Sequence, residues 1–293
     1  MELVSVVIIT YKRPLAILKR AIQSVLAQTY QNIELIIVND APEESSLHKE
    51  IQNYIRLLNN DRINYVLHEH NLGANAARNT GIKYSKGKYL AFLDDDDEWL
   101  PEKIEKQITA HVSDKIGIVY CGFYVNTNGV ITERKAVFPK KKALPALIEF
   151  NFIGSTSFPL LLKSAVERVG CFDVNQKSCQ EHELWIRIAK EYEVVGLSDC
   201  LGIYYISKDS TFKSNYASYI AGDNGILNKN KDLEKVYPIE FSNHLLGMAW
   251  YFASEKQYKL ALDYKIKAIK MCWYNVDNCT LIYSVKKMIF KYL

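Results

Sequence analysis

Five consecutive acidic residues, 94–98, form the part of this sequence best suited to chemistry. They follow the apolar run Tyr89–Leu93, which predicts a buried strand, so the acids stand where that strand ends. In an extended chain Asp94 and Asp96 point to one side and the other two aspartates to the opposite side. Carboxylate oxygens without histidine or cysteine suit Mg²⁺ or Mn²⁺, which bridge protein carboxylates to substrate phosphates. Because four adjacent aspartates repel one another, we interpret the run as a cation site; a solvated acidic turn or a helix start is the alternative.

Two other predicted strands also end in polar residues. Thr10 and Tyr11 close the run that begins at Val4, and Asp40 follows the run Ile33–Val38. If these strands are parallel, the polar residues lie at the same edge as Asp94, where such sheets bind ligands. An acidic side chain there could accept a hydrogen bond from a nucleobase N–H, and Tyr11 could stack on the base. Taken alone, each residue is also typical of an ordinary turn.

Two predicted helices begin with residues that could act on a phosphate or a hydroxyl group. Arg78 lies near the start of the helix expected at 74–84, where a cation and backbone N–H groups could hold phosphate; a surface arginine is the alternative. Glu181 and Glu183 flank His182 at the start of a helix that runs to Lys190. A carboxylate near the cation site could act as a general base, because it is ionised at neutral pH; an exposed first turn is the alternative.

Alternating strands and helices must position these residues. Through about residue 125 continuous apolar runs alternate with helical periodicity, which predicts a parallel sheet covered by helices on both faces. The expected strands are Val4–Thr10, Ile33–Val38, Ile63–Leu67 and Tyr89–Leu93, and the expected helices are Pro14–Gln28, His48–Leu58, Ala74–Tyr84 and Pro101–His111. A mixed pattern then predicts an antiparallel edge, with strands near Val119–Val125, Phe158–Leu162 and Leu201–Ile206.

The strand signals stop after about residue 210. Ile239–Ser254 and Lys256–Met271 predict two helices joined as a hairpin, and Thr280–Tyr292 predicts a last helix. We therefore expect two domains, 1–210 and 211–293, of which the second is a helical appendage.

Composition limits the class of protein. The chain has 293 residues, 48% of them hydrophobic and 24% charged, which is typical of a globular protein and excludes a disordered or fibrous one. Its longest apolar runs are far below the roughly 20 residues of a membrane span, and its N-terminus lacks the pattern of a secretion signal. We therefore expect a cytoplasmic protein.

These residues together resemble the family 2 glycosyltransferases, which have the GT-A fold. The likeness covers about residues 3–210, and its motifs occur in the family's order. The strings that carry it are VSVVIITYKR at 4–13, SVLAQTY at 24–30, VND at 38–40, NLG and ARNTG within 71–81, LDDDDEW with PEK within 93–103, and CQEHELWIR at 179–187. The resemblance implies an α/β catalytic domain with a Rossmann-like mixed sheet, mostly parallel, and a helical C-terminal region outside the family motifs.

The resemblance also implies roles for single residues. It assigns nucleotide binding to Thr10, Tyr11, Arg13, Asp40, Arg78, Asp94 and Asp95. Asp96 would be the direct ligand of Mn²⁺ or Mg²⁺, and Glu181 would be the catalytic base in place of the family's aspartate. Because glutamate is one methylene longer than aspartate, Glu183 remains an alternative base. It joins Trp185 and Arg187 as candidates that either contact the acceptor or support the residues that do. Asn39 also departs from the family, which has aspartate there.

The implied reaction is the inverting transfer of a sugar from a nucleotide sugar, expected to be a UDP-hexose, to a hydroxyl of a glycan, glycoprotein or lipid-linked acceptor. Glu181 would take the proton of the attacking hydroxyl, while the metal and Arg78 would stabilise the leaving diphosphate. One alternative is a catalytically weak scaffold with a sugar-nucleotide fold that works through its helical tail. Another is a metal-dependent nucleotidyltransferase.

The C-terminal region offers a further contact surface. Residues 251–293 hold eight lysines against three acidic residues, and many aromatic residues lie within 250–292. Aromatic residues favour interfaces, so we expect a homo-oligomer. Peripheral attachment to the anionic inner face of a membrane is the alternative, because lysine and aromatic rings on one helix suit the headgroup layer. A passive packed tail is the third reading, and we expect no nucleic-acid partner.

Overall fold

The computed structural model describes residues 1–206 and 216–272. The chain folds into two compact units, each with more contacts within itself than with the other. Unit 1 comprises Met1–Ala143 and Phe152–Ile226, and unit 2 comprises Leu144–Asn151 together with the chain from Leu227 onward. The domain boundary expected at residue 210 and the helix expected at 280–292 both lie outside the described residues, so they stay predictions.

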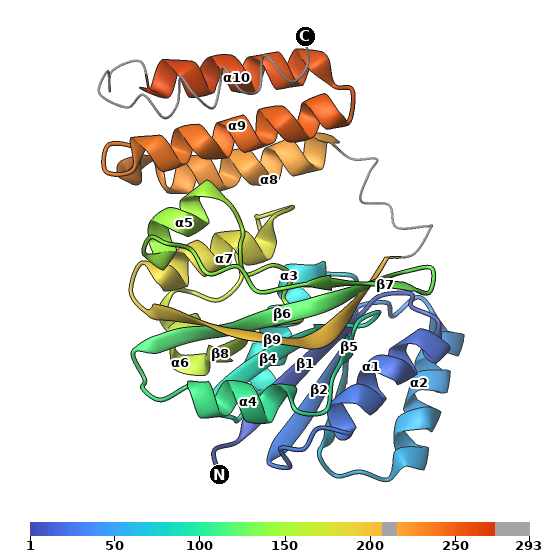
Figure 1. The fold of residues 1–293 in the computed structure, drawn as a ribbon. Coiled ribbons are helices and arrows are strands. Elements are labelled where there is room, and N and C mark those ends of the chain that lie inside the picture. The colour runs from blue at the N-terminus through green and yellow to red at the C-terminus, as the bar shows by residue number, and fades with distance from the viewer. Residues whose placement is uncertain (207–215, 273–293) are drawn as a thin grey trace. The chain divides into compact units, whose positions relative to one another are not determined.

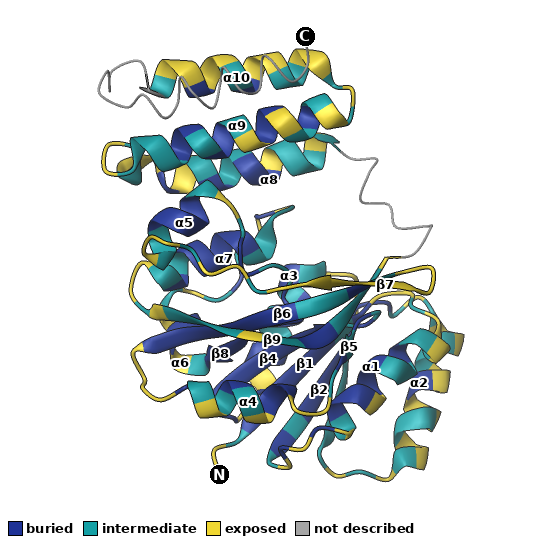
Figure 2. Ribbon diagram, viewed as in Figure 1, coloured by how far each residue is buried: buried dark blue, intermediate teal, exposed yellow. Residues whose placement is uncertain are grey.

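The first half of the sheet in unit 1 is parallel, as the sequence predicts (Figure 1). Its strands are β1 (Val4–Thr10), β2 (Ile33–Asn39), β3 (Ile63–Leu67) and β4 (Tyr89–Asp94), in the order β3-β2-β1-β4. Val4 pairs with both Ile33 and Tyr89, so β1, β2 and β4 run in register. These three strands are almost wholly buried, as Figure 2 shows, because helices cover both of their faces. Their carboxyl ends therefore meet at one edge.

The second half of the sheet is mixed. It continues from β4 through β8 (Leu160–Leu162), β6 (Ile116–Thr127), β9 (Glu193–Ile206) and β5 (Glu98–Trp99), while β7 (Val130–Arg134) pairs with β6. The short strand β8 is antiparallel to both β4 and β6 and lies between them, so antiparallel pairing begins inside the sheet; it also occurs at the predicted edge, where β5 is antiparallel to β9. The three leucines of β8 are buried.

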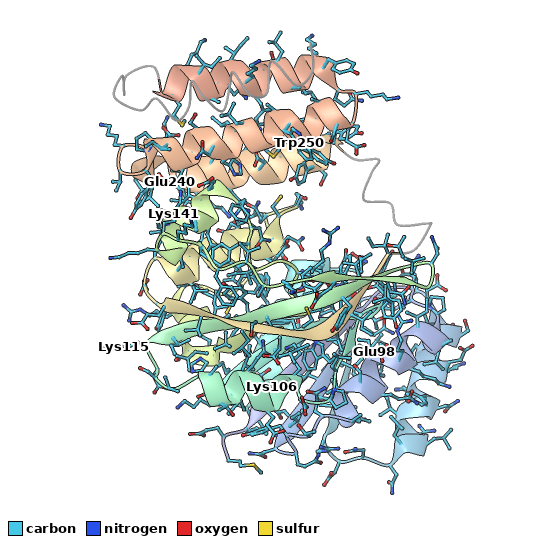
Figure 3. The ribbon with its side chains drawn as sticks, viewed as in Figure 1. Glu98, Lys106, Lys115, Lys141, Glu240 and Trp250 are labelled. Carbon is cyan, nitrogen blue, oxygen red and sulfur yellow. The ribbon has the colours of Figure 1, made fainter. Side chains whose placement is uncertain are left out.

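Helices pack on this sheet. They include α1 (Leu15–Leu26), α3 (Ala74–Tyr84), α4 (Lys103–Ala110), α6 (Lys163–Arg168) and α7 (Gln180–Ala189). Unit 1 also contains α2 (Ser45–Leu58), which contacts α1, and most of α8 (Tyr216–Lys229), whose last turn passes into unit 2. Strand β6 lies between α7 on one side and α4 on the other (Figure 1). Lys106, labelled in Figure 3, ties α4 to β9 through an ion pair of 2.8 Å with Asp199.

Unit 2 is helical. It contains most of α5 (Ala143–Glu149), a short 3₁₀ turn (Lys231–Leu233), α9 (Pro238–Ser254) and α10 (Tyr258–Cys272). The predicted hairpin is confirmed: α9 and α10 pack on each other, and the hydroxyl of Ser242 donates to the carbonyl of Ala268 at 3.0 Å. Among the described residues, no helix is both long and apolar enough to span a membrane.

Candidate active site

A cavity of about 500 Å³ opens in unit 1 at the carboxyl ends of β1, β2 and β4. The structure brings to its wall all eight residues for which the sequence predicts nucleotide or metal binding. They are Thr10, Tyr11, Arg13, Asp40, Arg78, Asp94, Asp95 and Asp96. Tyr204 of β9 also lines the cavity, and no motif in the sequence pointed to it.

The acidic run forms a turn, and the extended geometry assumed from the sequence is wrong there. Strand β4 ends at Asp94, and the backbone N–H of Asp97 donates to the carbonyl of Asp94 at 3.0 Å. The side chains nevertheless alternate in exposure. Those of Asp94 and Asp96 are 30% and 36% exposed, whereas Asp95 and Asp97 are buried. Two carboxylates therefore remain accessible to a ligand.

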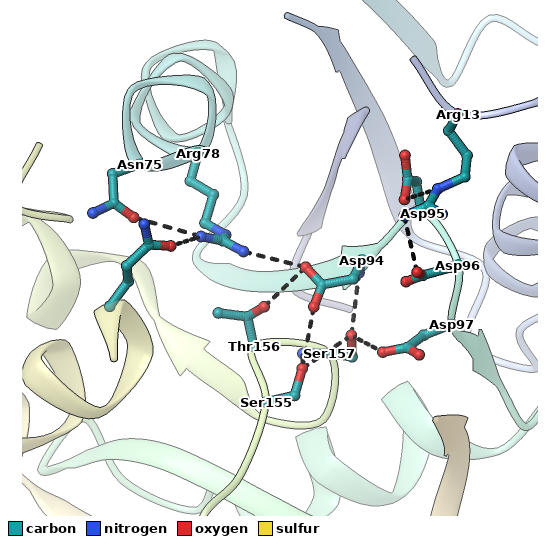
Figure 4. Close-up of polar contacts among 11 residues, drawn as sticks. Arg13, Asn75, Arg78, Asp94, Asp95, Asp96, Asp97, Ser155, Thr156 and Ser157 are labelled. Atoms are coloured by element: carbon teal, nitrogen blue, oxygen red, sulfur yellow. Dashed lines mark hydrogen bonds and ion pairs between the residues drawn. The ribbon is translucent and has the colours of Figure 1, made fainter. Parts of the chain in front are cut away.

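Three hydroxyl side chains in the loop before β8 hold the start of this turn (Figure 4). Ser155 and Thr156 each donate to the carboxylate of Asp94 at 3.2 Å. The hydroxyl of Ser157 accepts from the backbone N–H of Asp94 at 3.1 Å and donates to Asp97 at 2.6 Å. Burial, reinforced by the charge of Asp94, raises the pKa of Asp97 well above its ordinary value. The loop thus fixes Asp94, and the sequence offered no signal for it.

Arg13 joins the next two acids of the turn (Figure 4). Its Nε lies 2.8 Å from Asp95 and its Nη2 lies 2.9 Å from Asp96. The hydroxyl of Thr10 donates to the other oxygen of Asp95 at 2.7 Å. Despite these partners, burial raises the pKa of Asp95 to about 6, and burial also raises the pKa of Asp96. A bound cation would stabilise the charged form of desolvated acids that are packed this closely.

Asp40 is held on the wall of the cavity by three donors. The backbone N–H groups of Leu72 and Gly73 each donate to it at 2.8 Å, and Gly73 has the positive φ, 87°, that glycine tolerates. Nδ1 of His68 lies 2.7 Å from Asp40, and Nε2 lies 2.9 Å from the hydroxyl of Thr80. A neutral ring with its proton on Nδ1 satisfies both contacts. His68 was not predicted as a site residue.

Arg78 connects the acidic turn to the start of α7. Its Nη2 lies 3.2 Å from Asp94, and its Nη1 donates to Gln180 at 2.8 Å. Glu181 follows at the start of the helix and is partly exposed. Burial raises the pKa of Glu181; the charge of Arg78 opposes this shift and that of Asp94 adds to it. Glu181 therefore shares the electrostatic environment of the acidic turn, although it does not line the cavity itself.

The other candidates on α7 pack inside unit 1. Glu183 is 2% exposed and forms two bonds with Arg187, of 2.9 and 2.7 Å. Arg187 also donates to the backbone carbonyls of Val169 and Cys171. The indole N–H of the fully buried Trp185 donates to the carbonyl of Gly154 at 3.3 Å. The structure does not bring these three side chains to the cavity.

The residues present fit a divalent cation shared with a ligand. Among residues 1–206 and 216–272, no group of three or more histidine, cysteine, aspartate or glutamate side chains is arranged to hold a metal alone. Mg²⁺ bound with substrate phosphates commonly uses only one or two protein carboxylates. Asp94 and Asp96, both partly exposed on the cavity wall, supply such a set.

Comparison with known proteins identifies relatives along most of the chain. The sequence model described as "Glycosyl transferase family 2" matches residues 5–170. An uncharacterized glycosyltransferase of Rickettsia typhi, RT0329, is 30% identical over 97% of this chain and 92% of its own length. The UDP-Glc:alpha-D-GlcNAc-diphosphoundecaprenol beta-1,3-glucosyltransferase WfgD of Escherichia coli is 29% identical over 67% of this chain and 73% of its own length.

Solved structures share the fold. TarS 1-349 of S. aureus, in complex with UDP-GlcNAc, has a TM-score of 0.66 at 15% identity and covers 91% of this chain and 81% of its own. The mannosyltransferase PcManGT of Pyrobaculum calidifontis, in complex with GDP-Man and Mn²⁺, has a TM-score of 0.57 at 14% identity, with 95% and 87% covered. At these identities the likeness shows the fold alone.

Proposed function

The chain belongs to glycosyl transferase family 2 and is a glycosyltransferase, and from this premise we propose that it transfers a hexose from a UDP-sugar to a hydroxyl of a lipid-linked glycan, with inversion. The name of WfgD supports a lipid-linked acceptor and a UDP donor, and the TarS complex supports a UDP-sugar donor on this fold.

The proposal rests on one observation. A group that can bind an anion and groups that can bind a cation lie side by side on one wall of the cavity. Arg78 is only 8% exposed, and its Nε has no hydrogen-bond partner in the described structure. A buried unpaired donor of this kind is costly unless a ligand accepts from it. Asp94 and Asp96 lie on the same wall. A diphosphate with a bound divalent cation would fit both, since the diphosphate accepts from Arg78 and the cation binds the two aspartates.

The nucleoside occupies the part of the cavity near β1 and β2. Asp40 accepts a hydrogen bond from the N–H of the base; two of its bonds fall on Oδ1 and one on Oδ2, so Oδ2 keeps acceptor capacity. Tyr11 is 48% exposed and offers a ring on which the base stacks. Uracil carries an N–H at ring position 3, where cytosine has an acceptor, so a contact with Asp40 at this position favours uridine over cytidine.

Asp96, with Asp94 beside it, would hold Mn²⁺ or Mg²⁺. When bound, the ion offsets the negative charge that develops on the leaving diphosphate. The PcManGT structure is a complex with Mn²⁺ as well as GDP-Man, which is consistent with this proposal. Arg78 adds a second, fixed positive charge from the protein itself.

Glu181 acts as the base. It takes the proton of the acceptor hydroxyl while the hydroxyl oxygen forms a bond to the anomeric carbon and the bond from that carbon to the diphosphate breaks. Attack from the face opposite the leaving group inverts the anomeric centre. Glu183 is less suited to this role, because its carboxylate is buried and already neutralised by Arg187.

Thermal unfolding with nucleotides tests the donor and metal assignments together. UDP with Mn²⁺ should raise the unfolding temperature, since a ligand at a hundredfold excess over its Kd stabilises by about 2.7 kcal/mol. CDP should stabilise less, and chelation of Mn²⁺ should reduce the effect of UDP.

Asp96→Asn should lose the Mn²⁺-dependent part of the stabilisation and the transfer of sugar. Asp61→Asn, at an exposed position away from the cavity, is the matched control and should behave as the unmodified protein does. Equal stabilisation by UDP with and without chelator, or a folded Asp96→Asn protein with full turnover, would refute the metal assignment.

A further inference from the structure

The helix α10 in unit 2 exposes a row of large apolar side chains. Tyr258, Leu262, Ile266 and Ile269 are 69%, 56%, 42% and 36% exposed. Their spacings of four, four and three residues place them on one side of the helix. Tyr264 and Ala268, on the opposite side, are buried in unit 2. We call the row formed by the four exposed residues the outer face of α10.

Lysines border this outer face. Lys259, Lys267 and Lys270 are exposed, and Lys265 is partly exposed. Against these four lysines the helix carries one acidic residue, Asp263. At 100° per residue, Lys259 and Lys270 flank the apolar row on one side and Lys265 flanks it on the other. The outer face is therefore apolar at its centre and basic at its margins.

The positive charge at the margins of the outer face indicates which partner could bind there: a second copy of the chain, the residues that follow α10, or a lipid surface. In a two-fold dimer the same face meets itself, so its lysines would lie near lysines. The chain that follows, residues 273–293, holds three lysines and one aspartate, so it carries charge of the same sign. A surface with an apolar interior and anionic headgroups matches both parts of the outer face.

We propose that the outer face of α10 binds the surface of a membrane that contains anionic lipid. Its apolar row enters the boundary between headgroups and acyl chains, and the ammonium groups of the flanking lysines contact lipid phosphates. This interaction surface goes beyond the proposed function, because it requires neither the donor nor the acceptor.

Sedimentation with lipid vesicles tests the proposal on the full chain without nucleotide. The protein should sediment with vesicles of phosphatidylcholine and phosphatidylglycerol, should not sediment with phosphatidylcholine alone, and should be released by high salt. Lys259→Glu with Lys270→Glu should lower the vesicle affinity about thirtyfold or more, because both lysines lose their attraction to the anionic surface and the new carboxylates are repelled by it. Leu262→Ser with Ile266→Ser should also weaken binding.

Leu57→Ser is the matched control, because Leu57 is an exposed leucine on α2 of unit 1, and it should leave vesicle binding unchanged. Binding of UDP, measured on each variant, shows that the variant is folded and separates a failure of this proposal from a failure of the proposed function. Absence of vesicle binding would overturn the proposal, as would binding that both double variants retain. A lower particle mass of the Leu262→Ser, Ile266→Ser protein in light scattering would instead show that a second copy covers the face.

Discussion

At the scale of single residues, two glutamates two positions apart on α7 have opposite environments. Glu181 is partly exposed near Arg78 and Asp94, whereas Glu183 is buried against Arg187. Glu181→Gln should therefore lower turnover by roughly 10² to 10⁴, the usual contribution of a general base, with little change in UDP affinity. Steady-state kinetics and calorimetric titration with UDP would measure the two effects.

Glu183→Gln is the control for that prediction. It removes the partner of Arg187, so it should lower the free energy of unfolding while folded molecules keep their turnover, because breaking a buried ion pair costs about 3–5 kcal/mol. If instead Glu183→Gln abolished turnover in folded protein and Glu181→Gln did not, the base would be Glu183.

The raised pKa of Glu181 has a consequence for stability. Burial raises the pKa of this carboxyl above its ordinary value of 4.5, so the folded protein holds the proton more tightly than the unfolded chain does. Stability should therefore fall as the pH rises from 4.5 through the folded-state pKa, and the penalty should be complete above it. Because glutamine does not ionise, Glu181→Gln should be more stable than the unmodified protein at neutral pH and lose this advantage at low pH.

Denaturant unfolding of the two proteins across this pH range measures the difference. The stability difference between Glu181→Gln and the unmodified protein should be larger at neutral pH than at low pH. An equal difference at both pH values would mean that the surroundings of Glu181 do not destabilise its charged form.

In the proposed complex, His68 would act on the nucleotide only through Asp40, because His68 contacts Asp40 and does not line the cavity. His68→Ala removes one of three donors to that carboxylate, so the affinity for UDP should fall by about tenfold, which corresponds to 1.4 kcal/mol. His68→Asn places an amide N–H near the position of Nδ1 and should restore most of the affinity. His68→Gln places its amide near Nε2 and should not. Calorimetric titration would compare the affinities of His68→Asn and His68→Gln for UDP. Equal affinities of the two variants would exclude a positioning role for His68.

At the scale of elements, strong local patterns made part of the structure predictable. The apolar runs of β1, β2 and β4 predicted these strands to within one residue, and the polar residues at their ends predicted which side chains would share a cavity. The acidic run was correctly placed at the end of β4, but its turn was not foreseen. That turn depends on the distant Ser157 and on Tyr205 of β9, whose backbone N–H donates to Asp97 at 3.2 Å.

Other elements lack such a local signal. Strand β5 has two residues and α6 has six, too few to establish a period. Helix α8 was missed because two glycines interrupt its pattern, and these glycines serve tertiary packing. A Cβ at Gly222 would lie 2.5 Å from the carbonyl oxygen of Ser178. Tyr204 and His68 also lacked a local signal, since only the fold brings Tyr204 to the cavity and His68 to Asp40 behind its wall.

A glycine in α3 illustrates how packing sets the position of a functional helix. A Cβ at Gly81 would lie 2.2 Å from Cγ1 of Val7 on β1, so Gly81→Ala should push α3 away from the sheet and lower the free energy of unfolding by about 1–3 kcal/mol. Because α3 carries Arg78, UDP affinity should fall as well. Denaturant unfolding and titration with UDP measure both effects.

The matched control is Gly247→Ala in α9, where no atom lies within 4 Å of the added Cβ. That substitution should stabilise the protein by about 0.5–1 kcal/mol, because alanine loses less conformational entropy than glycine in a helix. If Gly81→Ala and Gly247→Ala lowered the free energy of unfolding by similar amounts, contact with Val7 would not limit how closely α3 packs on the sheet.

At the scale of the whole molecule, the C-terminal helices share a compact unit with a segment from the middle of the chain. Residues 144–151, from the middle of the chain, belong to the same compact unit as α9 and α10, and Asn243 of α9 donates to Glu149 at 3.3 Å. The expected homo-oligomer stays a prediction, and the basic outer face of α10 argues against a two-fold contact through that face.

This organisation predicts what truncation does. A chain that ends after residue 226 keeps α5 but loses the rest of unit 2, so Leu147 and Ile148, now 0% and 3% exposed, would face water. Burial of each such side chain contributes about 1.5–3 kcal/mol. The truncated protein should therefore bind a hydrophobic dye, aggregate and unfold at a lower temperature. Leu147→Ser with Ile148→Ser in the truncated chain should reduce both dye binding and aggregation, because these are buried apolar side chains of unit 2 that the truncated chain keeps. A truncated chain that stayed monodisperse and bound no dye would show instead that α5 is stable without the C-terminal helices.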